Sequence, residues 1–140
     1  MKAVYPTFIK NDGDAFLAFV PDLRIYTQGY DFYDAIEMAR DAICLALVSK
    51  EDEKEIIPEA SDSIRAKEAA ILDADEDLDF SDGTLTFVDV DTIGYRNKLN
   101  KRSVKKNCTI PAWLNEKAEQ AGVNFSRVLQ DALVEIVGTN

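Results

Sequence analysis

Six acidic residues lie close together in the middle of the chain, at a spacing that could bind a divalent cation. They are Asp73, Asp75, Glu76, Asp77, Asp79 and Asp82. A calcium-binding loop needs glycine at its sixth position and glutamate at its twelfth. Counted from Asp73, these positions hold Leu78 and Thr84, so the calcium pattern fails. We predict no metal site and expect a solvated loop or a contact surface for a basic partner. A magnesium-binding carboxylate cluster of the nuclease type is the alternative.

Histidine is absent from the chain, and its absence removes most hydrolytic chemistry. Serine–histidine and cysteine–histidine nucleophiles, histidine-bound zinc and imidazole acid–base catalysis all need that residue. We therefore predict no catalytic residues, no cofactor and no enzymatic activity. Cys44 and Cys108 form no CxxC motif, and we expect both to be reduced core thiols in a cytoplasmic protein. No signal peptide and no apolar run of about 20 residues is visible, which also favours the cytoplasm.

Charge is distributed unevenly along the chain, whose net charge is −10. Residues 1–98 contain 10 lysines and arginines against 22 aspartates and glutamates (−12), whereas residues 99–140 contain 6 against 4 (+2). The segment Lys101–Ile110 has four basic residues and no acid. This asymmetry predicts two modules. The basic segment is suited to DNA and the acidic module to a basic partner.

The first module is predicted to be an α+β fold. Strands are expected over residues 1–9, 15–20, 25–28 and 85–90, with a turn at Asp12–Gly13 after the first. A helix capped by Asp31 should run to about Lys50, because apolar residues recur there every three or four positions. A weaker helix is expected over residues 61–72. The element order is therefore β-β-β-α-(α)-β, and residues 92–100 are predicted to be a polar linker.

Aromatic residues are frequent in this module and could form a surface that stacks RNA bases. The charge of −12 over residues 1–98 (10 basic and 22 acidic side chains) opposes that function, because RNA phosphates would be repelled. We therefore expect most of these aromatic side chains to pack in the core. They are Tyr5, Phe8, Phe16, Phe19, Tyr26, Phe32 and Tyr33.

Residues 100–140 are predicted to form a strand followed by two short helices. Pro111 suits the first position of a helix that should end at Gly122. Asn124 should cap a second, amphipathic helix that ends at Gly138. A domain of roughly 35 residues without metal or disulfide is rarely stable alone, and its single strand has no partner. We therefore expect two copies to pair their strands as an antiparallel ribbon and to share one core.

Such a ribbon fits the major groove of B-DNA. Side chains alternate along a strand, so if Cys108 and Ile110 face the helices, their neighbours face outward. The outward side chains are then Lys105, Asn107 and Thr109. We predict that these three residues contact base edges, because lysine and asparagine carry the donors and acceptors that read them.

The start of the last helix is expected to provide a second contact to DNA. The backbone N–H groups of Phe125, Ser126 and Arg127, next to the cap Asn124, can hold a phosphate. Arg102 in the basic segment is a further predicted phosphate contact. The alternative is a dimerisation domain whose basic strand binds no DNA.

The second module resembles the ribbon-helix-helix repressors. The resemblance rests on Asn107–Pro111 (NCTIP), Ala112–Leu114 (AWL) and Ala121–Leu133 (AGVNFSRVLQDAL). It implies that bases are read from three alternating strand positions, which fall on Lys105, Asn107 and Thr109. Lys106 departs from the family, because it occupies an inward position that is usually apolar.

The first module resembles the HicB-type antitoxins. The matching segments, in order, are Tyr5–Pro6, Phe19–Leu23 (FVPDL), Thr27–Gly29 (TQG) and a helix with Asp34–Ala35 and Ala39. Arg24–Tyr26 (RIY) departs from the family, which frequently has a Pro-Gly-Cys-like bend there. Longer members of this family end in a ribbon-helix-helix or helix-turn-helix module, so the resemblance covers both ends of the chain.

The resemblance implies a fold and a domain organisation. Residues 1–95 are expected to be a partial RNase H-like domain without nuclease activity, residues 96–101 a linker, and residues 102–140 a ribbon-helix-helix domain. The partner is expected to be a HicA-type toxin, a small basic mRNA-cleaving ribonuclease with a double-stranded-RNA-binding-like fold. No toxin-contacting residue follows from the resemblance.

The function implied is that of an antitoxin that neutralises this toxin and represses its own operon. Repression would require a homodimer, or a higher oligomer, on operator DNA. Two competing interpretations stay open. One is a stand-alone ribbon-helix-helix repressor whose first module senses a small ligand. The other is an enzyme with a metal ion bound at Asp73–Asp82.

Overall fold

The structure, a computed structural model, describes residues 1–101 and 103–138. The chain divides into two compact units, Met1–Arg102 and Ser103–Asn140, called unit 1 and unit 2 below. Unit 1 contains a four-stranded antiparallel sheet, so the chain has a mixed α+β fold as the sequence predicts. None of the helices in the described ranges is long and apolar enough to cross a membrane.

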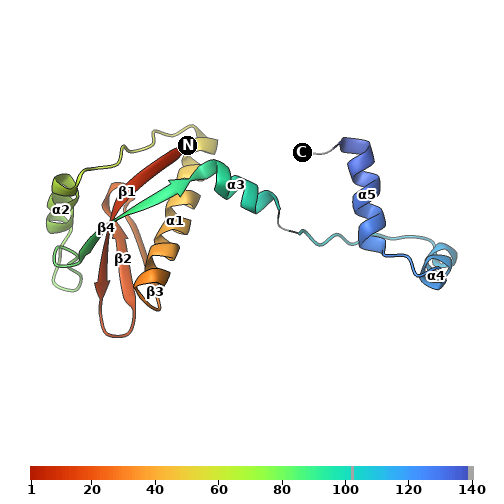
Figure 1. The fold of residues 1–140 in the computed structure, drawn as a ribbon, viewed down its shortest axis with the longest axis horizontal. Coiled ribbons are helices and arrows are strands. Elements are labelled where there is room, and N and C mark those ends of the chain that lie inside the picture. Colours follow the sequence, from red (N-terminus) through yellow and green to blue (C-terminus); the bar gives the residue numbers. More distant parts are fainter. Residues whose placement is uncertain (102, 139–140) are drawn as a thin grey trace. The chain divides into compact units, whose positions relative to one another are not determined.

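The sheet of unit 1 has the strand order β3-β2-β1-β4 (Figure 1). Its strands are β1 (Lys2–Asn11), β2 (Phe16–Val20), β3 (Ile25–Gly29) and β4 (Thr84–Asp91). The β1–β2 turn uses Gly13 at φ 99°, a conformation that favours glycine. A short 3₁₀ turn, η1 (Pro21–Leu23), links β2 to β3. The central strand β1 pairs along nearly its whole length with β4, from Lys2↔Asp91 to Ile9↔Thr84.

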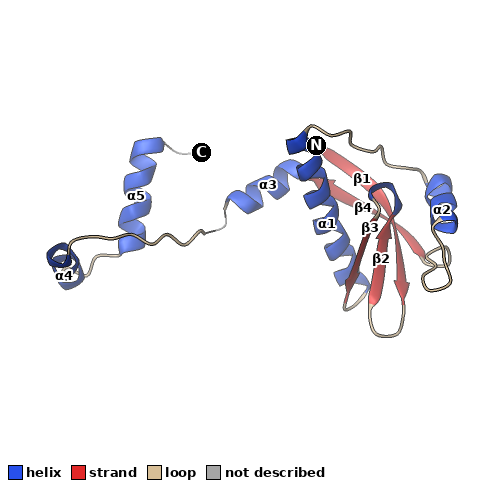
Figure 2. Ribbon diagram, turned by 180° about the vertical axis from the view of Figure 1, so that it is seen from behind, coloured by secondary structure: helices blue, strands red, loops and turns tan. Residues whose placement is uncertain are grey.

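Helix α1 (Phe32–Glu53) packs on one face of this sheet (Figure 2). It begins where predicted, because the Asp31 carboxylate accepts the Asp34 N–H at 2.7 Å. It ends three residues beyond the predicted Lys50, where Lys54 adopts a left-handed conformation at φ 57°. The strand β3 ends close beneath the helix start, since a Cβ on Gly29 would lie 2.3 Å from the Ala35 nitrogen. The core on this face is built mainly from Tyr5, Ile9, Ala18, Val20, Ala35, Ala39, Ile43, Leu47, Val88 and Val90.

Helix α2 (Ser63–Leu72) covers part of the opposite face of the sheet. The Asp62 carboxylate caps it by accepting the Arg65 N–H at 2.9 Å. A second core forms there from Phe8, Phe19, Ala66, Ala70 and Phe80. Unit 1 therefore has packed apolar side chains on both faces of its sheet, and each face is fixed by one capped helix.

Residues 92–100, predicted to be a linker, form helix α3 (Thr92–Asn100) instead. The Asp91 carboxylate caps it by accepting the N–H groups of Ile93 and Gly94 at 3.1 and 3.2 Å. Arg96 then ties it to α1 through Glu51. The segment looks polar in sequence because much of what holds the helix is these bonds to distant residues, together with Tyr95, which packs against the core. The helix also occupies most of the linker that was predicted over residues 96–101.

The aromatic residues of unit 1 are divided between core and surface. Tyr5 and Phe8 are buried as expected, together with Phe19. Tyr26, Phe32 and Tyr33, which were also among the residues expected there, are 53%, 37% and 73% exposed. The expectation fails for these three because Tyr26 lies on the edge strand β3, and Phe32 and Tyr33 lie at the start of α1.

Unit 2 contains helices α4 (Ala112–Gln120) and α5 (Phe125–Val137). Asn124 caps α5 as predicted, since its side chain accepts the Arg127 N–H at 3.1 Å. Pro111 stands at the cap of α4, one position before the predicted one.

The strand predicted before α4 is not formed in the single chain, where residues 103–110 have no regular secondary structure. A strand needs a hydrogen-bonded neighbour, and the described part of unit 2 provides none. Cys108, predicted to be a core thiol, is therefore exposed. Ile110, predicted to face the helices, is 40% exposed.

No residue in the range 103–138 is buried. The apolar side chains of α5 are well exposed, from 38% for Leu129 to 78% for Ile136. Unit 1 encloses two cores, whereas unit 2 lacks one along its described residues. This contrast distinguishes a self-sufficient domain from one whose apolar helix face is left uncovered.

Candidate functional site

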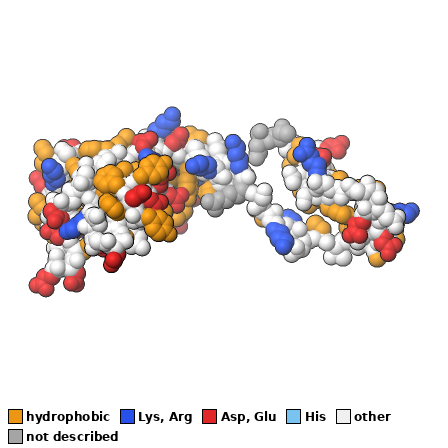
Figure 3. Space-filling model, turned by 60° about the horizontal axis from the view of Figure 1, so that its bottom comes forward, with side chains coloured by type: hydrophobic (Ala, Val, Ile, Leu, Met, Phe, Trp, Pro, Cys, Tyr) orange, Lys and Arg blue, Asp and Glu red, His pale blue; other side chains and the backbone are white. Residues whose placement is uncertain are grey.

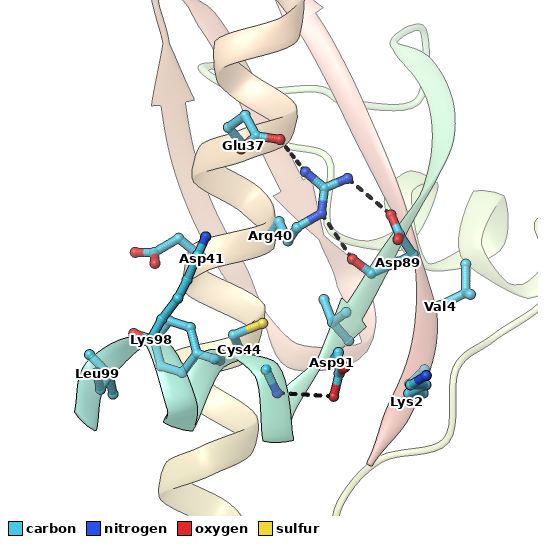
Figure 4. Close-up of a pocket in the computed structure, with 14 residues that line it drawn as sticks. Lys2, Val4, Glu37, Arg40, Asp41, Cys44, Asp89, Asp91, Lys98 and Leu99 are labelled. Carbon is cyan, nitrogen blue, oxygen red and sulfur yellow. Dashed lines mark hydrogen bonds and ion pairs between the residues drawn. The ribbon is translucent and has the colours of Figure 1, made fainter. Parts of the chain in front are cut away.

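A hollow of about 770 Å³ in unit 1 lies beside the edge strand β4 (Figure 4). We call it the α1–α3 hollow. Its walls come from the start of β1, the middle of α1, the end of β4, and α3. Both basic and acidic side chains line it, so the charge that it presents depends on which of them are already paired.

Arg40 is fixed at this hollow by three polar contacts. Its Nε donates to the Asp89 backbone carbonyl, and its Nη2 to the Asp89 carboxylate, each at 3.0 Å. Its Nη1 forms an ion pair with Glu37, one helical turn away. The hydrogen bond from Arg40 is the main cause that holds the pKa of Asp89 below its usual range. The guanidinium thus covers the outward carbonyl of Asp89 on the exposed sheet edge, which is a common protection for an edge strand.

Two further groups at the hollow have a structural role. The Asp91 carboxylate caps α3 and is drawn in Figure 4 with its bond to the helix start. Cys44 is buried, and burial raises the pKa of its thiol. A buried thiol of raised pKa is protonated and a weak nucleophile. Asp89, Asp91 and Cys44 are therefore part of the fold and do not form a reactive group.

Lys2 and Lys98 also line the hollow, and neither has an ion-pair partner among the residues that the structure describes. Asp41 also lines the hollow, and in the same ranges its carboxylate neither caps a helix nor forms an ion pair. This set lacks a nucleophile next to a base, and the chain has no histidine to supply one. The arrangement can bind a charged surface, but the residues present do not form a catalytic pair.

The acidic segment Asp73–Asp82 forms loops closed by its own side chains. The Asp75 carboxylate accepts the N–H groups of Asp77 and Leu78 at 2.9 and 2.7 Å. Asp79 accepts the Ser81 N–H at 2.8 Å, and Lys10 bonds Asp82 at 2.9 Å. Across the described ranges, no group of three or more acidic or cysteine side chains is arranged to hold a metal ion. The segment has the geometry of turn-forming aspartates.

The three predicted base-contacting residues lie in the irregular segment of unit 2. Lys105, Asn107 and Thr109 are all exposed. They occupy alternate positions, so they would share one face if the segment became extended. The single chain brings them into no common strand, and their contact with DNA stays a prediction.

The predicted phosphate contacts lie at the start of α5. Asn124, Phe125, Ser126 and Arg127 are exposed there. The Arg127 guanidinium is 3.5 Å from the Asp131 carboxylate on the same helix. Because this ion pair is exposed and weak, a DNA phosphate could take the place of Asp131 as the partner of Arg127. Arg102 lies outside the described residues.

Sequence reasoning missed the two arginine clusters of unit 1. Arg40 with Asp89, and Arg96 with Glu51, join residues more than 40 positions apart. Such pairs leave no local pattern in the sequence. One local signal was available, because Asp91–Thr92 directly after an apolar strand is a plausible helix cap.

Exposed apolar side chains gather on one face of α5. They are Phe125, Val128, Leu129, Leu133, Ile136 and Val137. On unit 1, by contrast, Figure 3 shows acidic side chains scattered among exposed hydrophobic ones. The two units therefore present different surfaces to partners, one apolar and helical and the other acidic.

Comparison with known protein families gives one match over most of the chain. The sequence model of a family described as "HicB_like antitoxin of bacterial toxin-antitoxin system" matches residues 5–132. No curated protein matches the chain in sequence.

Similar chains occur among solved structures. A chain of a toxin–antitoxin complex from Streptococcus pneumoniae is 26% identical with a TM-score of 0.58, and the alignment covers 96% of this chain and 99% of that one. The antitoxin HicB of Burkholderia pseudomallei is 20% identical with a TM-score of 0.47, covering 96% of each chain. A chain of the HicA3 and HicB3 toxin–antitoxin complex is 24% identical with a TM-score of 0.48, covering 63% of this chain and 98% of that one.

Proposed function

The chain belongs to the family of HicB-like antitoxins of bacterial toxin–antitoxin systems, and we propose that it binds and neutralises a HicA-type toxin that cleaves mRNA. The observation that carries this proposal is the family match over residues 5–132, which spans both units. The similar Streptococcus pneumoniae chain comes from a toxin–antitoxin complex, which supports a protein toxin as the partner.

Unit 1 is the proposed toxin-binding part. It has its own core on both faces of the sheet, so it can present a rigid surface. Most of the acidic charge of the chain lies there: residues 1–98 contain 22 acidic and 10 basic side chains. Complementary charge accelerates encounter with a basic ribonuclease and orients it. We describe unit 1 as a partial RNase H-like fold without nuclease activity, on the basis of its three-stranded meander, its helix α1 and its fourth strand beside β1.

Unit 2 is the proposed dimerisation and DNA-binding part. Its described residues enclose no core, and α5 presents an uncovered apolar face. Two copies that pair residues 103–110 as an antiparallel ribbon would satisfy the backbone groups of that segment and cover the face of α5. This is the geometry of a ribbon-helix-helix domain, and it supports a homodimer that represses its own operon.

In such a dimer each predicted DNA contact has a role. Lys105, Asn107 and Thr109 would lie on the outer face of the ribbon against base edges. The N-terminus of α5 would hold a phosphate through the N–H groups of residues 125–127 next to Asn124. Arg102 would add charge at the backbone. Lys106 would point inward, where its aliphatic stem can pack and its ammonium group reach solvent.

Co-expression with the product of the neighbouring open reading frame tests the proposal. We expect a small basic protein that co-purifies with this chain and whose cleavage of mRNA stops when the complex forms. A neighbouring product that neither binds nor cleaves RNA would contradict the toxin assignment. DNA binding alone would then indicate a stand-alone repressor.

A further inference from the structure

A second hollow in unit 1, about 280 Å³ in volume, is lined by aromatic rings and two carboxylates. It lies on the sheet face opposite α1, near the C-terminal end of α2. We call it the aromatic hollow, and its lining residues used below are Phe19, Tyr26, Asp73, Asp75 and Phe80. It shares no lining residue with the α1–α3 hollow.

Stacked rings form one wall of the aromatic hollow. Phe19 and Tyr26 stack at 4.6 Å between ring centroids with an interplanar angle of 17°. Phe80 is tilted against both, at 5.3 Å from Phe19 and 6.2 Å from Tyr26. Phe19 and Phe80 are almost fully buried, whereas Tyr26 is 53% exposed. The ring of Tyr26 is thus supported by Phe19 and Phe80 while about half of the residue stays exposed, and an exposed aromatic ring attracts a cation.

Negative charge surrounds this wall. The Asp75 carboxylate is held in place by the N–H groups of Asp77 and Leu78, at 2.9 and 2.7 Å. Asp73 stands at the C-terminal end of α2, where the helix dipole also favours a positive charge. Two carboxylates and a helix C-terminus repel phosphate, so the hollow does not suit a nucleotide.

The chain itself shows that a guanidinium is attracted to this rim. The Arg24 Nη2 lies 3.6 Å from the Asp73 carboxylate, while the Arg24 side chain stays 74% exposed. Arg24 and Tyr26 belong to the RIY segment that departs from the usual bend of the family. Arg24 is not among the residues that line the hollow, so its guanidinium does not fill the space beside Tyr26.

We propose that the aromatic hollow accepts an arginine side chain of the basic protein that unit 1 binds. A guanidinium is planar, stacks on an aromatic ring and can bond to two carboxylates at once, which a lysine ammonium does less well. This inference rests on the proposed function for the identity of the partner. It adds a chemical group and a location, which the family match does not provide.

The test combines a small probe with the toxin. N-acetyl-arginine amide is titrated into the full chain and followed by NMR at Tyr26 and Leu78, with the neutral isostere N-acetyl-citrulline amide as the reference. We expect shifts with arginine and none with citrulline. Equal shifts with both compounds, or none with either, would overturn the proposed site whether or not the toxin binds. Shifts at Tyr26 caused by a single-stranded RNA oligonucleotide would assign the hollow to a base and overturn it as well.

Toxin affinity is then measured by calorimetry for two variants. Tyr26→Leu removes the ring, and Asp75→Asn removes the charge while its side-chain oxygen can still accept the loop N–H groups. We expect each variant to bind the toxin about tenfold more weakly than wild type, because each loses one partly desolvated contact to the arginine cation. Tyr30→Leu, at a 94% exposed position, and Asp77→Asn, in the same loop, are matched controls that should bind normally.

The two failures are distinguishable. A wild-type chain that does not bind the toxin contradicts the proposed function, and the arginine titration still decides the hollow. A wild-type chain that binds, with Tyr26→Leu and Asp75→Asn unchanged, overturns the inference and leaves the proposed function intact. Thermal unfolding of each variant identifies any loss that is due to misfolding, and in that case the arginine titration of the wild type decides.

Discussion

Arg96 joins the last helix of unit 1 to α1 through a small polar cluster. Its Nη2 lies 3.0 Å from Glu51 and 2.8 Å from Asp52. The Glu51 carboxylate also accepts the Thr92 hydroxyl at 3.0 Å. The hydrogen bond from Arg96 is the main cause that lowers the pKa of Glu51. The folded state therefore binds a proton at Glu51 less readily than the unfolded state does.

The sign of this shift predicts how stability depends on pH. A carboxyl group whose pKa is lowered on folding stabilises the fold above its unfolded pKa, and this contribution is lost as the pH falls through its folded pKa. Glu51→Gln should lower the free energy of unfolding by about 1 kcal/mol or less at neutral pH, because the cluster is partly exposed. The deficit should shrink at about pH 3, below the pKa of an unperturbed glutamate.

Urea unfolding at the two pH values measures this difference. Glu59→Gln is the control, because Glu59 is exposed and has no hydrogen bond or ion pair along the described chain. A deficit for Glu51→Gln that is as large at low pH as at neutral pH would contradict the assigned role of its charge.

At the residue scale, the proposed DNA recognition is tested at Asn107. Asn107→Ala should weaken binding to DNA from the upstream region of its own operon by roughly 1–3 kcal/mol, the value of one good base contact. Toxin binding should be unchanged, because Asn107 lies outside unit 1. A gel-shift titration measures the effect, with the exposed Asn100→Ala as the control. Equal affinity of Asn107→Ala and wild type for this DNA would contradict the prediction that Asn107 contacts a base edge.

At the scale of elements, local patterns predicted those that depend on local chemistry. The alternation and apolar runs of the four strands, and the caps Asp31 and Asn124, have their causes within a few residues. These elements lie within a few residues of their predicted bounds.

The features that were missed have distant causes. Helix α3 is held by a bond from Arg96 to a residue 45 positions away. The aromatic hollow brings Tyr26 against Phe80, which no periodicity reveals. The ribbon predicted before α4 needs a second chain, so its strand cannot form in a single copy. The α+β class of the fold was therefore predictable from the sequence. The α1–α3 hollow and the aromatic hollow were not, because each is formed by residues that lie far apart in the chain.

The exposed apolar face of helix α5 leads to a prediction on the proposed dimer. Leu133 lies in the uncovered apolar face and is 47% exposed in the single chain. Leu133→Glu should convert the proposed dimer to a monomer, because a charge at a buried dimer interface is strongly destabilising. Light scattering after size exclusion measures the mass. Gln130→Glu adds the same side chain on a flank of the helix and should stay dimeric. A Leu133→Glu dimer as stable as wild type would contradict the proposed interface.

Cysteine reactivity gives an independent measurement on the same variants. Cys44 is buried in unit 1, and burial raises the pKa of its thiol. Cys108 is exposed in the single chain but would face the helices in the proposed ribbon. Alkylation should therefore modify Cys108 quickly in Leu133→Glu and slowly in wild type, while Cys44 stays protected in both. Fast modification of Cys108 in the wild-type dimer would argue against the ribbon.

For the whole molecule, the two units differ in both charge and self-sufficiency. Residues 1–98 carry a large excess of acidic side chains and enclose two cores. Residues 103–138 have a basic start and no buried residue. The proposed binding of both a basic ribonuclease and acidic DNA is favoured when these opposite surfaces lie on separate units.

The most direct measurement of this division compares the full chain with a fragment of residues 1–102 in two assays, inhibition of mRNA cleavage by the toxin and binding to operator DNA. We predict that the fragment, whose folding is checked by circular dichroism, inhibits the toxin at the same molar ratio as the full chain and does not shift the DNA. A folded fragment that fails to inhibit the toxin, or that still binds the operator like the full chain, would contradict the account.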